Sequence, residues 1–304
     1  MNLRNAIREA LASIGCRGEV AAVSRLDGLR DELQGLVEKN LLTETFYKEN
    51  LAGFKFSPPP EMAAAAASVI ITATPQPISE VRFDLGGRTI TAVIPPTYIH
   101  RPDTEKVRRV LEETLHPAGY RLAPASLPLK LLAACCGLGV YGRNNIFYIP
   151  GEGSFFRLNA FYSDLPCPED HWQRPRLLER CENCTACLQK CPTGAITADR
   201  TLIRADRCLT LFNESKADFP EWIDAGWHNA LIGCMMCQAA CPENRESLKN
   251  TVTAATFFAE ETAMILENRS PELLPDATRK KMAALDMLDY YRQLPRNLRA
   301  LLDK

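Results

Sequence analysis

Cysteine is the residue that most constrains this chain, because eight of its twelve cysteines lie between positions 181 and 241. A disulfide-rich secreted domain also concentrates cysteine, but the N-terminus shows no signal-peptide core, and a chain of 304 residues buries a core without disulfides. The cysteines therefore indicate ligation of metal. The two runs are Cys181-x2-Cys184-x2-Cys187-x3-Cys191-Pro192 and Cys234-x2-Cys237-x3-Cys241-Pro242, with Cys208 between them.

The spacing within the runs favours iron–sulfur clusters over zinc. Three closely spaced cysteines surround one face of a [4Fe–4S] cubane, and a fourth, followed by proline, ligates the other cluster in two-cluster ferredoxins. Four-cysteine zinc sites also contain CxxC pairs, but they explain neither the triple spacing of the first run nor the two Cys-Pro endings. We therefore predict two [4Fe–4S] clusters. The first set of ligands is Cys181, Cys184, Cys187 and Cys241, and the second set is Cys191, Cys208, Cys234 and Cys237.

The second run differs from that of a simple ferredoxin. It lacks the third cysteine of a CxxCxxC pattern, and Cys208 takes that place from a distant segment. This difference favours an electron-input domain of a larger protein over a free-standing carrier. Residues 1–165 hold no cluster ligand, so we expect them to bind an electron acceptor or to present the clusters to one.

The rest of the pattern predicts an α+β protein with three segments. Helical and strand-like stretches interleave in residues 1–165, as in an α/β-type domain. Residues 166–250 carry the clusters, and residues 251–304 are mostly helix-forming. The expected helices are 2–14, 26–42, 103–115, 127–136 and 277–292, capped in part by Asn2, Asp103 and Asp276, and the expected strands are 68–73, 88–94, 146–149 and 155–162.

Charge and hydropathy limit the partners and the cellular compartment that we expect for the protein. The net charge of −1 gives no overall positive field to attract nucleic acid. The longest nearly apolar run, residues 62–74, contains serine and threonine and is too short to cross a bilayer. Together with the absence of a signal peptide, this predicts a cytoplasmic protein with no membrane partner.

Residues 130–246 resemble the epoxyqueuosine reductases, the cobalamin and iron–sulfur enzymes of tRNA wobble-base maturation, whose relatives include reductive dehalogenases. All eight cysteine positions are present at nearly the family spacing, whereas the N-terminal third is similar only loosely, mainly at 68–73. The motifs that carry the resemblance are Gly137-Leu-Gly139, Gly142-Arg143-Asn144, Gly153-Ser154, the run Cys181 to Ile196, Arg207-Cys208, Gly233-Cys234, Cys237-Gln238 and Cys241-Pro-Glu-Asn244.

The resemblance implies a nitroreductase-like mixed α/β domain that binds a corrinoid over residues 1–165. A bacterial ferredoxin-like double-cluster domain would follow over 166–250, and a helical C-terminal segment would pack on the core over 251–304. Small residues would let backbone N–H groups approach the corrin or its tail. The expected cobalamin-binding residues are Gly137, Gly139, Gly142, Arg143, Asn144, Gly153 and Ser154.

One position departs from the family pattern. The family's proton-donating aspartate aligns with Ala123, and no carboxylate occurs between positions 121 and 130. The catalytic residue is therefore unknown. Tyr98 and Tyr141 are the alternative proton donors, and a shifted alignment would assign the role to Asp103 or Glu105.

These observations predict an oxidoreductase that delivers low-potential electrons through two clusters to cobalamin. A ferredoxin- or flavodoxin-type donor would supply the electrons. The alternatives are an epoxyqueuosine reductase acting on tRNA, a reductive activator of a corrinoid methyltransferase system with a corrinoid protein as partner, and a cluster carrier without corrinoid. The missing aspartate favours the last two over tRNA reduction. Eight thiolates and two cluster cores of about +2 each bring the net charge to about −5, which further disfavours tRNA. The glycine loop favours a corrinoid.

Overall fold

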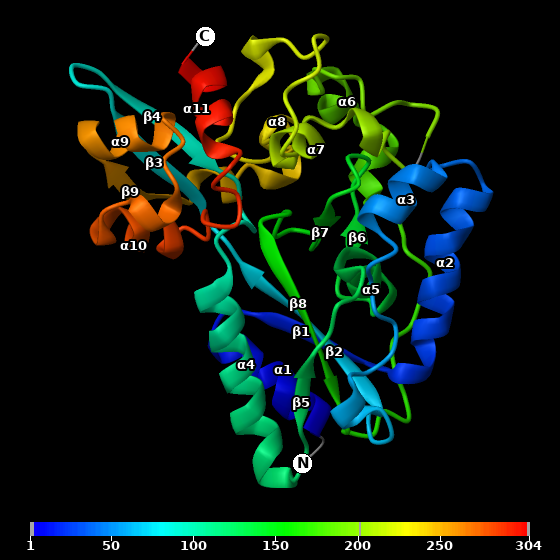
Figure 1. Cartoon of the computed structure of the whole chain (residues 1–304). Coiled ribbons are helices and arrows are strands. Elements are labelled where there is room, and N and C mark those ends of the chain that lie inside the picture. The colour runs from blue at the N-terminus through cyan, green and yellow to red at the C-terminus, as the bar shows by residue number, and fades with distance from the viewer. Residues whose placement is uncertain (1–2, 201, 303–304) are drawn as a thin grey trace. The chain divides into compact units, whose positions relative to one another are not determined.

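The computed structural model describes residues 3–200 and 202–302, and the expected cap Asn2 lies outside them. The chain forms two compact units, each built from two separate stretches of sequence (Figure 1). The first unit comprises Met1–Pro75 and Arg101–Cys184, and the second comprises Gln76–His100 and Thr185–Lys304. This division differs from the three expected segments, because residues 76–100 belong to the second unit and residues 166–184 belong to the first.

An antiparallel four-stranded sheet organises the first unit, in the order β1-β2-β8-β5. Its strand β2 alternates between two cores: Ile70 packs with the side chains of α1 and α4, while Val69 and Ile71 pack with those of α2 and α5. Helices cover both faces, which explains why β2 is an almost continuous apolar run. The strands are β1 (Arg17–Ala22), β2 (Ser68–Pro75), β5 (Leu122–Pro124) and β8 (Phe156–Ser163).

The helices of this unit follow the apolar periodicity of the sequence. Helix α5 ends before a two-stranded hairpin, β6–β7, which leads through a turn into β8. The helices are α1 (Leu3–Ser13), α2 (Leu26–Glu38), α3 (Glu44–Asn50), α4 (Arg101–Leu115) and α5 (Leu129–Cys135), and the hairpin strands are β6 (Val140–Tyr141) and β7 (Phe147–Tyr148).

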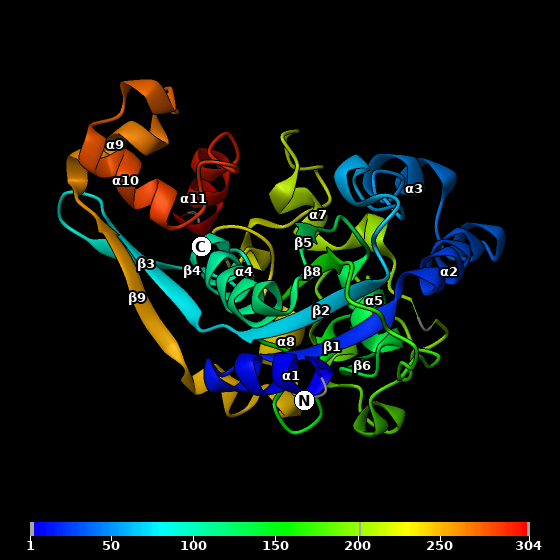
Figure 2. The same ribbon diagram turned by 90° about the horizontal axis from the view of Figure 1, so that it is seen from below.

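A three-stranded sheet in the order β4-β3-β9 organises the second unit. Strands β3 and β4 are antiparallel, and β9 runs parallel to β3. Figure 2 shows β9 beside β3. The apolar side chains of this sheet share one core with those of α9, α10 and α11. The elements are β3 (Ile78–Asp84), β4 (Thr89–Ile94), β9 (Thr251–Phe257), α9 (Ala259–Leu266), α10 (Asp276–Ala284) and α11 (Leu294–Leu302).

The cysteine-rich part of the second unit consists of short helices and turns. Helices α6 and α8 pack against each other, and each lies within one of the two cysteine runs. These helices are α6 (Ala186–Lys190), α7 (Leu209–Glu214) and α8 (Met236–Ala239).

The mixed α and β composition is confirmed, but several expected elements are wrong in detail. Strands β1, β3 and β9 were not expected, and β9 lies in the segment predicted to be mostly helical. Helix α10 ends at Ala284 rather than 292, because the chain turns at Asp286, whose backbone is left-handed with φ of 55°. Asp276 is the first residue of α10 and Asp103 the third of α4, so neither is a cap.

Candidate metal centre

The second set of cysteines gathers within the second unit. Cys191 ends α6, Cys208 precedes α7, and Cys234 and Cys237 flank the start of α8. Burial raises the pKa of both Cys234 and Cys237, and the charges of the neighbouring thiolates Cys191 and Cys208 raise it further. The four side chains are therefore within electrostatic reach of one another, and none forms a disulfide. Ligation to iron would offset this repulsion between thiolates.

The first set is distributed over both units. Cys181 and Cys184 belong to the first unit, and Cys187 and Cys241 belong to the second. The charge of Cys187 also contributes to the raised pKa of Cys237, which places the two cysteine runs close together within the second unit. Among the described residues, no three His, Cys, Asp or Glu side chains converge closely enough to hold a single metal ion.

The glycines of the expected cobalamin loop are required by the hairpin itself. A Cβ on Gly139 would lie 2.3 Å from the backbone oxygen of Tyr148 and 2.5 Å from the ring of Phe147. A Cβ on Gly142 would lie 2.5 Å from the ring of Tyr148. The sequence argument attributed these small residues to a corrin, but they allow β6 and β7 to pack closely on each other.

Three other expected cofactor residues also have roles within the fold. Gly137 has φ of 76°, so a residue with a side chain is disfavoured at this end of α5. The buried Asn144 donates from Nδ2 to the Tyr148 hydroxyl at 2.9 Å and accepts from the backbone N–H of Ile146. Gly153, with φ of 86°, closes the turn that precedes the buried Ser154. A contact of these residues with cobalamin stays a prediction.

Arg143 connects the hairpin to the first cysteine run. Its backbone N–H donates to the sulfur of Cys181 at 3.5 Å, and its Nη2 donates to the backbone oxygen of Cys181 at 2.6 Å. The Nε–H of Arg143 is buried and has no hydrogen-bond partner among the described residues. The guanidinium therefore keeps one donor for an acceptor that the protein does not supply.

Ala123 occupies a buried position in β5, opposite Tyr162 of β8. Ala123 is 6% exposed and belongs to the apolar core. The nearby carboxylate of Asp164, just after β8, is bonded to Arg121. Arg121 donates to Asp164 from its backbone N–H and from Nε, and these bonds lower the pKa of Asp164 although burial opposes this. Exposed Glu105 is bonded to Arg108, which lowers the pKa of Glu105 and makes it a poor acid.

The two candidate tyrosines are both partly exposed, and desolvation by the surrounding protein raises the pKa of each. Tyr98 lies in the second unit, where its hydroxyl donates to a carboxylate oxygen of Glu214. Burial raises the pKa of Glu214, and the bond from Tyr98 opposes that change. A Cβ on Gly233, the residue before Cys234, would lie 2.3 Å from the Tyr98 hydroxyl oxygen. Tyr98 therefore packs against the second cysteine run.

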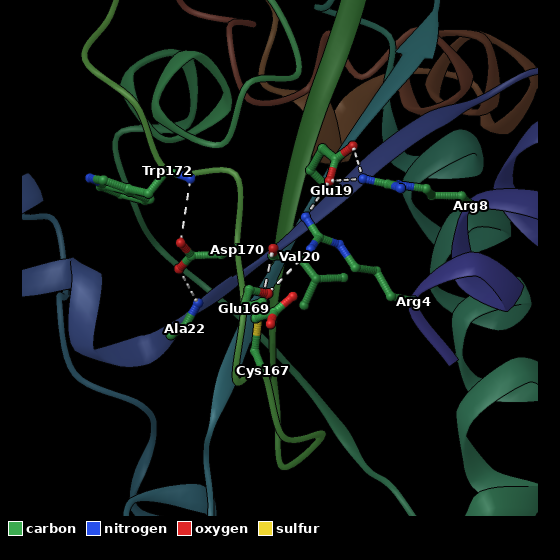
Figure 3. Close-up of polar contacts among 9 residues, drawn as sticks. All are labelled: Arg4, Arg8, Glu19, Val20, Ala22, Cys167, Glu169, Asp170 and Trp172. Atoms are coloured by element: carbon green, nitrogen blue, oxygen red, sulfur yellow. Dashed lines mark hydrogen bonds and ion pairs between the residues drawn. The ribbon is translucent and has the colours of Figure 1, made fainter. Parts of the chain in front are cut away.

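A short segment after β8, residues 167–172, is fastened to β1, and we call it the strap (Figure 3). Asp170 accepts hydrogen bonds from the backbone N–H of Ala22 and from Arg25, while Arg4 donates to the backbone oxygen of Glu169. The thiol of Cys167 donates to the same oxygen at 3.2 Å. Cys167, which lies outside both cysteine runs, is thus a structural thiol.

Two polar residues near the cysteines escaped the sequence argument. Thr193 lies two residues after Cys191, and Asn229 lies five residues before Cys234. Each places a polar atom beside a sulfur of the second set. Their closeness to the cysteines in sequence was the available signal, but it did not show which way either side chain points.

The comparisons with known proteins agree with this geometry. Residues 180–244 match the model of a 4Fe-4S double cluster binding domain. Epoxyqueuosine reductase of Aliivibrio fischeri is 33% identical over 150 residues, which cover 48% of this chain and 39% of that protein. Its Yersinia pestis counterpart is 35% identical over 139 residues, covering 45% and 33%. The chain is similar to the epoxyqueuosine reductases over about half of its length. The expected resemblance to this group of oxidoreductases is confirmed, although the matches span well under two thirds of the relatives' length.

Solved structures extend the likeness of fold to nearly the whole chain. Epoxyqueuosine reductase of Streptococcus thermophilus superposes with a TM-score of 0.68 at 18% identity, covering 99% of this chain and 81% of that one. The Bacillus subtilis enzyme, described with its catalytic aspartate loop swung out of the active site, gives 0.69 at 18% identity and the same coverage. The fold is therefore that of epoxyqueuosine reductase. Its nitroreductase-like and ferredoxin-like parts stay predictions. No helix among residues 3–200 and 202–302 is long and apolar enough to cross a membrane.

Proposed function

We propose that the chain is an iron–sulfur oxidoreductase that passes low-potential electrons through two [4Fe–4S] clusters to a cobalamin. The observation that carries the proposal is the grouping of Cys191, Cys208, Cys234 and Cys237 within the span that matches a double-cluster domain. Two clusters held close together provide a path for single electrons, with a ferredoxin- or flavodoxin-type protein as donor.

The cobalamin part of the proposal rests on the family resemblance in the sequence and on Arg143. The buried, unpartnered Nε–H of Arg143 suits an acceptor on a propionamide or on the phosphate of the cobalamin tail. Ser154 is the second polar residue that we assign to this role. When bound, the cobalt supplies a strongly reducing centre, and the protein's own contribution is to hold the cofactor and to deliver electrons.

The first experiment tests cluster and cobalamin binding separately. Anaerobically reconstituted protein is expected to contain about eight iron and eight sulfide per chain. Calorimetry should then show cobalamin binding that weakens in Arg143→Ala, while Arg121→Ala, which removes an exposed arginine paired with Asp164, serves as the matched control. Zinc in place of iron would refute the cluster assignment, and absent cobalamin affinity in the fully loaded protein would refute the corrinoid.

A second candidate function is reduction of epoxyqueuosine in tRNA. The relatives bear that name, and one solved epoxyqueuosine reductase holds an epoxyqueuosine-modified tRNA stem loop, which weighs against our expectation that tRNA is a poor partner. Two points oppose this candidate. In the alignment with the family Ala123 stands at the position of the acid, and the cationic side chains of α10 are paired with carboxylates, as in Lys281 with Glu261 and Arg279 with Asp276.

The missing acid makes this candidate measurable. A positioned general acid typically contributes about 10²–10⁴ in rate, so we expect weak or absent turnover of epoxyqueuosine-containing tRNA together with intact cobalt reduction. Ala123→Asp should raise turnover. Ala123→Asn, which introduces a side chain of the same shape as aspartate but without an acidic proton, should not. Robust turnover by the unchanged protein would favour tRNA reduction. Cobalt reduction without turnover in any variant would favour a reductive activator whose partner is a corrinoid protein.

A further inference from the structure

Asn229 makes a three-way contact at the start of the second cysteine run. Its Oδ1 accepts the backbone N–H of Met235 at 2.7 Å, and its Nδ2 donates to the backbone oxygen of Trp227 at 2.9 Å. The same Nδ2 lies 3.3 Å from the sulfur of Cys234. Because the Met235 N–H can only donate, the amide oxygen must face it, and the amide N–H groups must face the sulfur.

Thr193 makes a related contact with another ligand of the second set. Its hydroxyl oxygen lies 3.6 Å from the sulfur of Cys191, and its side chain is buried. A thiolate bound to iron has no proton to give, so in the loaded protein the hydroxyl is the donor. Arg207, the residue before Cys208, donates from Nε to the backbone oxygen of Thr193 at 3.1 Å and so holds this segment in place.

Hydrogen bonds to cluster sulfurs are one of the factors that set the reduction potential. Reduction places additional negative charge on the cluster and its sulfurs, so a donor stabilises the reduced form more than the oxidised form. Two side-chain donors on two ligands of one cluster act in the same direction. Thr193 is buried and Asn229 is partly buried, and hydrogen bonds shielded from water are stronger than exposed ones.

We propose that Asn229 and Thr193 raise the reduction potential of the second cluster by donating hydrogen bonds to the sulfurs of Cys234 and Cys191. Both are positioning residues, because they act through the ligands and not on a substrate. This inference rests on the proposed function in one respect, since it requires the second set of cysteines to hold a [4Fe–4S] cluster.

The closest matched test is at Thr193, where Thr193→Val removes the hydroxyl without changing the shape and Thr193→Ser keeps it. The measurement is an anaerobic redox titration of the reconstituted protein, followed by electron paramagnetic resonance of each cluster. For Thr193→Val we expect the equilibrium constant for reduction of one cluster to fall about tenfold, which is about 59 mV for one electron. Thr193→Ser should titrate like the unchanged protein.

Asn229→Asp provides a second, independent test. The aspartate keeps an acceptor for the Met235 N–H but loses the bond to the Trp227 oxygen, and it presents an oxygen instead of an N–H group to the sulfur of Cys234. The potential of the same cluster should fall further than in Thr193→Val. Unchanged potentials in both variants, with about eight iron per chain, would overturn this inference and leave the proposed function standing. Iron that does not bind to the unchanged protein would overturn both.

Discussion

The sequence singled out both the hairpin of residues 137–149 and the two cysteine runs, but contacts within the protein explain only the hairpin. The glycines and Asn144 of the hairpin are accounted for by their contacts with Phe147 and Tyr148. The cysteines, in contrast, form no disulfide, and burial and mutual charge raise the pKa of Cys234 and Cys237. The glycines and Asn144 are therefore explained without a ligand, whereas the gathered cysteines and the buried Nε–H of Arg143 still indicate one.

The largest expected effect removes a ligand from the cysteine runs. Cys237→Ser should lose the second cluster, so that the iron content of reconstituted protein falls from about eight to about four per chain. Cys167→Ser is the matched control, because that thiol belongs to the strap and should leave the iron content unchanged. Equal iron in the two variants would contradict the distinction between structural and ligating cysteines.

The next effect concerns the hairpin and is one of stability. Gly139→Val forces a side chain against the Tyr148 backbone oxygen and the Phe147 ring, and we expect it to lower the free energy of unfolding by about 3 kcal/mol. Gly28→Ala in α2, where a Cβ meets nothing within 4 Å, should instead raise that free energy by up to about 1 kcal/mol. Chemical denaturation of both variants without cofactor tests the comparison. A Gly139→Val protein that is stable yet binds no cobalamin would restore the corrin explanation.

A smaller loss is expected from Asn144→Ala. The substitution removes the bond to the Tyr148 hydroxyl and the one from the Ile146 N–H, and buried groups left without partners cost about 1–3 kcal/mol. The free energy of unfolding should fall by that amount before any cofactor is added. A variant with unchanged stability but weakened cobalamin binding would show that Asn144 serves the ligand and not the hairpin.

The smallest effect is expected in the strap, where Asp170 is paired with Ala22 and Arg25. Hydrogen bonds from Arg25, the largest cause, hold the pKa of Asp170 below its usual value although burial opposes this. Because the pKa is lower in the folded protein than in the unfolded chain, the contribution to stability is complete above the unfolded value of about 3.9 and is lost as the pH falls through the lower folded value. We expect about 1–2 kcal/mol, measured as the difference in acid unfolding between the unchanged protein and Asp170→Asn.

The sequence predicted the elements whose pattern is local. Strands β2, β4 and β8 and helices α1, α2, α4 and α5 were expected close to their observed bounds, because apolar periodicity and flanking proline or glycine define them. Strand β9 was missed, since its partner β3 lies far away in the sequence and its side chains are mostly exposed. The cysteine spacing indicated the clusters, but the orientations of Asn229 and Thr193 depend on backbone turns that no spacing reveals.

The parallel pairing of β3 with β9 has a consequence for synthesis of the chain. The hairpin β3–β4 emerges from the ribosome long before β9, and at about 5–20 residues per second the intervening residues 95–250 take roughly 8–31 s to make. During that interval Val81 and Phe83, which are buried in the finished protein, have neither β9 nor the helices α9–α11 to cover them. A nascent chain halted near residue 165 would therefore expose an apolar hairpin and be prone to aggregate, and translation speed across the cysteine-rich region becomes a determinant of yield.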